Sequence, residues 1–286
     1  MLQPLTPTYK FLAEAKKNTE EQMLTEKQIF HASSLSTMPA IKTRQETICT
    51  NFEPDFDLDF ARRLLGHKAG RSLPTGSANR LARIEKQIKG IVHPKIIFCF
   101  HNLKKDGYNI DQRGNKGVTL DNGTHFTSAK LAYSLRNACS IVAFIATVGR
   151  ELDLEIDRLM KEGDYADAYV ADALGSGAIE HLAENFHHRI SNEIKASNLT
   201  AGLRFSPGYC DWDVTEQPTV FSLLDAWKIG VSLGDTFLMT PRKSISGIFG
   251  LYATGKSPEI RSKNPCLRCA KKNCIARRTD TEKTVQ

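Results

Sequence analysis

The stretch RFSPGYCDWD, residues 204–213, combines a guanidinium, a turn, aromatic rings and two carboxylates. Pro207 and Gly208 suit the central positions of a type II turn, because proline presets φ and glycine accepts a positive φ. Arg204, just before the turn, can bind a carboxylate through two parallel hydrogen bonds. Tyr209, just after it, offers a ring face to a cation or a flat base. The stretch therefore predicts either a small-molecule binding loop or a surface loop with an ordinary ion pair.

A second stretch, IGVSLGDTFLMTPRKSISGIFG at residues 229–250, changes the balance between these two interpretations. Together the two stretches resemble the activation domain of cobalamin-dependent methionine synthase, most closely its stand-alone versions. That family has an Arg-x-x-Pro-Gly-Tyr loop and a later Met-x-Pro-x-x-Ser-x-Ser-Gly run that ends at the ligand. Stand-alone relatives also share RFSPGY, then an acidic and aromatic pair and a glutamine, here Asp211, Trp212 and Gln217. The resemblance covers roughly residues 55–255.

The resemblance implies a site for S-adenosylmethionine (SAM), in which Arg204 binds the carboxylate of the ligand. Relatives carry a Tyr-Phe pair at the end of the second motif, where this chain has Phe249-Gly250. A contact at Gly250 would therefore be made by the backbone. The implied cofactor-binding residues are Arg204, Gly208, Tyr209, Phe249 and Gly250.

The family also uses an aspartate near the N-terminus for the ammonium group of SAM. Its position in this chain is not marked by a motif, and Asp57 and Asp59 are the candidates that the sequence offers.

The chemistry that the resemblance implies is SAM-dependent reductive methylation, the reaction of an activation component of methionine synthase. A flavodoxin- or ferredoxin-type donor reduces the inactive cobalamin, and SAM then methylates it. Reduced cobalamin is itself the nucleophile, so the protein has to orient the methyl group and needs no catalytic acid or base. The sequence shows no catalytic dyad and no cobalamin-binding Asp-x-His-x-x-Gly motif. Cobalamin is therefore expected on a partner, a cobalamin-binding methyltransferase subunit or domain.

The hydrophobic pattern predicts an α+β fold. A stripe that recurs every four residues from Val170 to Ile194 predicts one helix of about eight turns. Asn122-Gly123 predicts a hairpin, and the apolar run CSIVAFIAT, residues 139–147, predicts a buried strand. Helices and strands do not alternate regularly, which argues against a parallel βαβ sheet. The resemblance implies a helix-flanked, largely antiparallel twisted sheet.

Two segments near the motifs carry more specific expectations. The small residues Gly175, Ser176 and Gly177 interrupt the long helix, at a cost of roughly 1 kcal/mol per glycine, so they predict close approach of another element or of the ligand. Thr215 is expected to cap a helix with Pro218 in its first turn. The buried stripe of that helix is expected to contain Val220, Leu223, Leu224 and Trp227.

Charge, composition and the family resemblance together divide the chain of 286 residues into three parts. Residues 1–54 form a polar N-terminal extension, 55–255 the SAM-binding domain, and 256–286 a basic, cysteine-rich tail. The net charge of +7 lies almost entirely in the last part, which holds nine basic and three acidic residues from Gly255 onward. The domain itself is thus close to neutral, which does not support a nucleic-acid-binding face. No apolar run is long enough to span a membrane and no signal peptide is evident, so a cytoplasmic protein with reduced thiols is expected.

The tail contains three cysteines among arginines and lysines, at Cys266, Cys269 and Cys274. A Cys-x-x-Cys pair can bind one metal ion, and nearby cations lower thiol pKa values. The tail therefore predicts an iron–sulfur cluster or a zinc ion, with Cys210, a second chain or solvent as the fourth ligand. A basic tail with free thiols is the simpler interpretation. The alternative function is a metal- or cluster-binding redox or interaction protein that acts through this tail.

Overall fold

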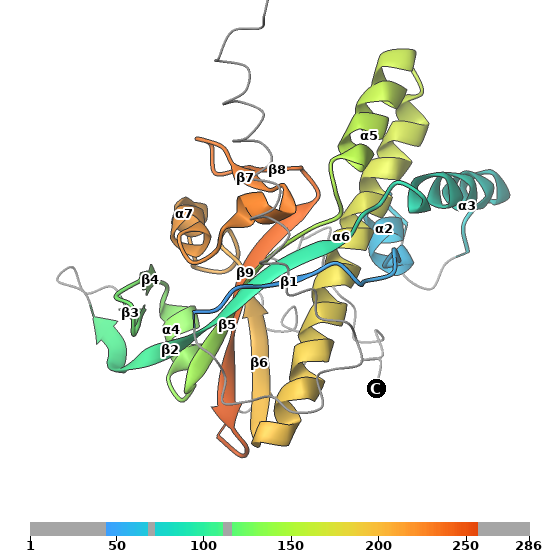
Figure 1. The fold of residues 1–286 in the computed structure, drawn as a ribbon. Helices are drawn as coiled ribbons and strands as arrows, with labels where there is room; N and C mark the ends of the chain where they lie inside the picture. The colour runs from blue at the N-terminus through green and yellow to red at the C-terminus, as the bar shows by residue number, and fades with distance from the viewer. Residues whose placement is uncertain (1–43, 68–71, 111–115, 257–286) are drawn as a thin grey trace, which may run out of the picture. The chain divides into compact units, whose positions relative to one another are not determined.

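The computed structural model describes residues 44–67, 72–110 and 116–256, all of which lie within one compact unit (Figure 1). The three tail cysteines and most of the N-terminal extension lie outside the described residues. Within the described ranges, no helix combines the length and apolar character that a bilayer crossing requires.

A seven-stranded sheet forms the centre of the unit, and every pair of neighbouring strands in it is antiparallel. The order is β4-β3-β2-β5-β9-β6, with β1 paired to β2 outside this path. The prediction of an antiparallel sheet in an α+β fold is confirmed. The strands are β1 (Thr47–Cys49), β2 (Lys95–Ile110), β3 (Lys116–Leu120), β4 (His125–Thr127), β5 (Ser140–Thr147), β6 (Leu199–Phe205) and β9 (Ser244–Ala253).

Strand β1 lies inside the segment that the sequence assigns to a polar extension. Thr47 pairs with Phe98 and Cys49 with Ile96, so the sheet begins before residue 55. Three residues are too short for a periodic pattern, and their strand conformation depends on pairing with β2.

Helices cover both faces of the sheet. One face is covered by α2 (Leu58–Leu64), α3 (Thr75–Lys89), α5 (Glu151–Glu162) and the long helix α6 (Tyr165–Glu193). The other carries α4 (Ala129–Leu135), α7 (Gln217–Phe221) and the short 3₁₀ helix η3 (Ala226–Ile229). The remaining elements are the 3₁₀ helices η1 (Ile194–Ser197) and η2 (Val214–Glu216) and the small hairpin β7 (Ser232–Leu233) and β8 (Met239–Thr240).

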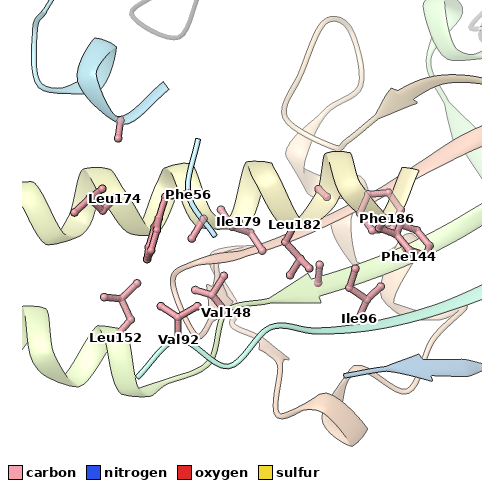
Figure 2. Packing of buried hydrophobic residues seen from close by; sticks show 14 of the residues in the cluster. Phe56, Val92, Ile96, Phe144, Val148, Leu152, Leu174, Ile179, Leu182 and Phe186 are labelled. Carbon is pink, nitrogen blue, oxygen red and sulfur yellow. The ribbon is translucent and has the colours of Figure 1, made fainter. Parts of the chain in front are cut away.

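Helix α6 confirms the predicted stripe, and its apolar side chains make up a large part of the larger core. Figure 2 shows Leu174, Ile179, Leu182 and Phe186 along α6, facing side chains of the sheet and of α5. Phe186 lies 5.3 Å from Phe144 of β5, measured between ring centroids. This packing fixes α6 beside the sheet, and thus beside its edge strand β6.

The small residues of α6 are explained by close packing, one of the two predicted reasons. A Cβ at Gly177 would lie 2.7 Å from the backbone oxygen of Asp57, and one at Gly175 would lie 2.6 Å from Leu152. The carbonyl of Gly177 also accepts a hydrogen bond from the Asp57 N–H at 3.2 Å. Helix α6 thus needs glycine where the N-terminal segment and α5 approach its backbone.

The predicted hairpin at Asn122-Gly123 is confirmed, because β3 and β4 pair as antiparallel neighbours. Gly123 adopts a φ of +90° in the turn between β3 and β4. The Ser128 side chain caps α4 by accepting a hydrogen bond from the Leu131 N–H at 3.0 Å.

The expected helix that begins at Thr215 is wrong in its cap and in part of its stripe. Asp213 is the capping residue, since its carboxylate accepts hydrogen bonds from both the N–H and the hydroxyl of Thr215. The segment then breaks into η2, α7 and η3, which rotates Trp227 out of the stripe and leaves it 68% exposed. Pro218 does lie in the first turn of α7, as predicted.

Candidate ligand-binding site

The two sequence motifs meet on adjacent strands. Arg204, at the end of β6, lies directly opposite Phe249 of β9, and Phe205 lies opposite Ile248. A Cβ at Gly247 would lie 2.7 Å from the backbone oxygen of Phe205, so the second motif needs glycine where the first one crosses it. Two segments that are distant in sequence therefore lie side by side in the sheet.

The Pro-Gly turn directly follows β6. The Tyr209 N–H donates to the Ser206 carbonyl at 3.2 Å, and Gly208 has a φ of +89°, as a type II turn requires. The Gly208 N–H in turn donates to the Trp212 carbonyl at 2.8 Å. The loop is closed on itself and presents Tyr209 with 65% of its surface exposed. Cys210, next to it, is an exposed free thiol.

The end of the first motif anchors this loop to α4. Asp211 accepts hydrogen bonds from the Ser128 hydroxyl at 2.7 Å and from the Lys130 N–H at 3.0 Å. Burial acts to raise the pKa of Asp211, but these hydrogen bonds outweigh burial and hold the pKa below its usual value. Trp212 is buried against Phe126, with ring centroids 5.4 Å apart. The Asp211 carboxylate and the Trp212 indole thus anchor the loop to α4 and to Phe126, and the turn itself stays accessible.

Arg204 lies between the edge strand and helix α6. Its Nη2 atom is 3.2 Å from an oxygen of Glu184 and 3.5 Å from an oxygen of Glu180, and its side chain is 15% exposed. The other carboxylate oxygen of Glu184 lies 3.1 Å from Nε2 of His188. The guanidinium of Arg204 therefore already lies beside two carboxylates. The carboxylate of a bound ligand would have to use the N–H donors that Glu180 and Glu184 leave available.

Phe249 and Gly250 lie inside the sheet. The Phe249 side chain is fully buried in the core beneath α6, 6.2 Å from Phe186 between ring centroids. A Cβ at Gly250 would lie 2.6 Å from Leu135 and 2.6 Å from the Tyr252 hydroxyl. Other parts of the protein therefore fill the space around both residues. A ligand contact at either residue stays a prediction.

The aspartates of the N-terminal segment differ in what they contact. Asp57 caps α2 by accepting the Phe60 N–H at 2.8 Å, and Asp59 pairs with Arg62 at 3.2 Å. Asp55 lies instead beside α6, with a carboxylate oxygen 3.5 Å from Nε2 of His181. His181 directly follows Glu180, so the carboxylate of Asp55 contacts α6 one residue along the chain from a partner of Arg204.

Three residues of this site were not recognised in the sequence, namely Glu180, Glu184 and His187. All three lie on α6, spaced so that they share the helix face toward β6. Polar positions in a helical stripe were the available signal. It was weak, because such positions usually mark a solvent-exposed face.

Other parts of the molecule carry less chemistry. An open hollow of about 690 Å³ lies at the opposite end of the strand order and does not include Arg204. Its lining residues are Asn102, Leu103, Lys104, Leu120, Asp121, Gly123 and Cys139. No group of three or more metal-binding side chains occurs in the part of the chain that the structure describes.

Fold and paired motifs together define an α+β domain with its candidate ligand site at the edge of an antiparallel sheet. The family model that matches this chain is described as vitamin B12 dependent methionine synthase, activation domain, and it covers residues 132–258. This range holds both motifs and the long helix, so the resemblance indicated by the motifs is confirmed.

A solved structure, the MetH reactivation domain bound to AdoHcy, matches with a TM-score of 0.54 and 19% sequence identity. The match covers 80% of this chain and 84% of that one, and at this identity it shows a shared fold. No curated protein matched in a sequence search.

Proposed function

We propose that this protein binds SAM, the methyl donor, where β6 meets β9. In this way it reactivates a cobalamin-dependent methyltransferase, methionine synthase in particular. The observation that carries the proposal is the register that places Arg204 opposite Phe249 and directly before the Pro-Gly turn. The family match over residues 132–258 and the fold shared with the MetH reactivation domain bound to AdoHcy support it.

Each part of the ligand has a proposed partner. The carboxylate binds Arg204, through donors that Glu180 and Glu184 leave available. The ammonium group binds Asp55, which replaces the sequence candidates Asp57 and Asp59 because their carboxylates serve α2. Gly208 lets the turn backbone approach the ligand, and the exposed ring of Tyr209 covers it.

The protein contributes position and charge, and its partner contributes the nucleophile. Reduced cobalamin on the partner takes the methyl group, so that the carbon–sulfur bond of SAM breaks and AdoHcy leaves. The orientation of the sulfonium by the turn is the catalytic contribution of this chain. The electron donor is proposed to be a flavodoxin- or ferredoxin-type protein.

Calorimetry with purified protein tests the binding step. Wild-type protein should bind SAM, and Arg204→Gln should bind it about 10- to 100-fold more weakly, since a hydrogen bond to a charged group contributes roughly 1.5–3 kcal/mol. Arg158→Gln is the matched control, because it removes an exposed arginine that is also paired with two carboxylates, those of Glu155 and Glu162. Absence of SAM binding by wild-type protein at high micromolar concentration would contradict the proposal.

A second assay tests the reaction. Cobalamin-loaded methionine synthase without its own activation domain is mixed with a reductant and methyl-labelled SAM. Labelled methylcobalamin should form only when this protein is present, and more slowly with Arg204→Gln. Equal label with and without the protein would exclude the proposed role even if SAM binds.

The alternative function, through the metal-binding tail, rests on cysteines outside the described residues. No observation on the described residues favours it over the SAM-binding function.

A further inference from the structure

Strand β6 contains a bulge immediately before Arg204. Ala201 pairs with Leu251, but Arg204 pairs with Phe249, so two residues of β6 lie opposite the single residue Gly250. The extra residue changes the alternation of side chains between the two faces of the sheet. The aim of Arg204 therefore depends on this bulge.

Removal of the bulge would turn Arg204 to the other face. With the register of Ala201 continued, Arg204 would pair with Ile248, which belongs to the core on the α4 and α7 face. Its observed partner Phe249 belongs to the core beneath α6. Only the bulged register places the guanidinium beside Glu180 and Glu184.

One face of the bulge is filled by Tyr252. A Cβ at Gly202 would lie 2.7 Å from the Tyr252 ring, and a Cβ at Gly250 would lie 2.6 Å from its hydroxyl. The hydroxyl donates to the Ser134 carbonyl at 2.8 Å, which fixes the ring in place. The glycine at position 250 is thus explained by the tyrosine that packs over it.

The other face of the bulge is held by His187 of α6. Its Nε2 atom lies 2.8 Å from the carbonyl oxygen of Gly202, which is one of the two bulged residues. Its ring meets Phe249 edge-on, with centroids 4.8 Å apart and an interplanar angle of 83°. One side chain therefore contacts both strands at the point where the two motifs meet.

We propose that His187 is a positioning residue for the ligand site: its hydrogen bond to Gly202 holds the β6 bulge and thereby aims Arg204 at the ligand carboxylate. This inference rests on the proposed function for its ligand. The hydrogen bond is the essential contact, because a buried carbonyl without a partner would favour the regular register.

Three variants separate the two contacts of His187. His187→Gln keeps a donor at about the position of Nε2 and loses the ring, whereas His187→Phe keeps the ring and loses the donor. His187→Ala loses both. SAM affinity by calorimetry should stay within about 3-fold for Gln and fall about 10-fold or more for Phe and Ala. Unfolding in urea, measured in parallel, shows whether each variant is folded.

The matched control is His125, a partly buried histidine at the other end of the strand order, with a side-chain hydrogen bond to Thr119. His125→Phe should bind SAM like the wild type. If His125→Phe weakens binding as much as His187→Phe, the effect is general destabilisation and the inference is wrong.

A double-mutant cycle gives the decisive readout. If His187 acts through Arg204, then His187→Phe combined with Arg204→Gln should bind SAM no more weakly than Arg204→Gln alone. Additive losses, or an unchanged affinity in folded His187→Phe, would overturn the positioning role and leave the proposed function standing. Absence of SAM binding by wild-type protein would instead refute the proposed function.

Discussion

Single residues of this site combine a chemical and a geometric task. Arg204 supplies the charge, but its direction is decided by Gly202 and Gly250, which leave room for Tyr252. Gly208 supplies the positive φ of the turn. The turn at Gly208 was predictable from the sequence, because it depends on residue type and immediate neighbours, whereas the ligand-binding role of Arg204 stays a prediction. The function of the other two glycines was not predictable, since their neighbours are distant in sequence.

His187 also makes a prediction on pH at this scale. Burial lowers the pKa of His187 below the usual value, and the charges of Arg204 and His188 lower it further. The hydrogen bond to Gly202 and the charge of Glu184 act in the opposite direction but do not outweigh burial. The neutral form is thus favoured in the folded state, and its stabilising contribution is present above the unfolded pKa near 6.5 and is lost as the pH falls through the folded value.

Wild-type protein should therefore lose more stability between pH 7 and pH 5 than His187→Phe does. Thermal unfolding at half-unit pH steps measures the difference. Parallel curves for the two proteins would show that His187 does not titrate between the folded and unfolded states in this range.

Helix α6 is the element on which the site depends. The period of its apolar residues predicts its length and buried face well, because helical periodicity is local information. The helix also presents Glu180, Glu184 and His187 to β6 on another face. This role follows only from where the helix lies on the sheet. Likewise, Asp213 rather than Thr215 caps the segment after the turn, and this segment forms three short helices in place of the single predicted one.

Gly177 of α6 provides a test at the scale of the element. Gly177→Ala improves helix propensity by roughly 1 kcal/mol, but its Cβ would lie 2.7 Å from the backbone of Asp57. The N-terminal segment must then move away from α6, and we expect a net loss of about 1–3 kcal/mol in the free energy of unfolding.

Gly76→Ala in α3 is the control, because a Cβ at this position has no neighbour within 4 Å. It should be neutral or stabilise the protein by up to about 1 kcal/mol. Urea unfolding of both variants measures the contrast, and a stabilised Gly177→Ala would contradict the close contact.

At the scale of the whole molecule, the end of the last described strand is fixed to the sheet by residues that precede the cysteine tail. Strand β9 ends at Ala253, and the N–H and hydroxyl of Thr254 both donate to the Asn198 carbonyl next to β6. The last strand is therefore tied to the sheet without the residues that follow it.

Removal of residues 257–286 should therefore leave SAM affinity and thermal stability close to those of the full chain. The same truncation should abolish any bound zinc or iron, which metal analysis and visible absorbance measure. Cys266→Ser with Cys269→Ser in the full chain is the control for loss of the thiols alone. A truncated protein that no longer folds would show that the tail belongs to the domain.

The sequence by itself determined the class of fold, the long helix, the Pro-Gly turn and the likeness to the activation domain, since each depends on local pattern or on residues within one motif. Only the tertiary structure decided how the motifs meet, where Arg204 points and which residues surround it. The physical reason is the antiparallel register. One extra residue in β6 changes which face a side chain occupies, and that residue is held by a tyrosine from β9 and a histidine from α6.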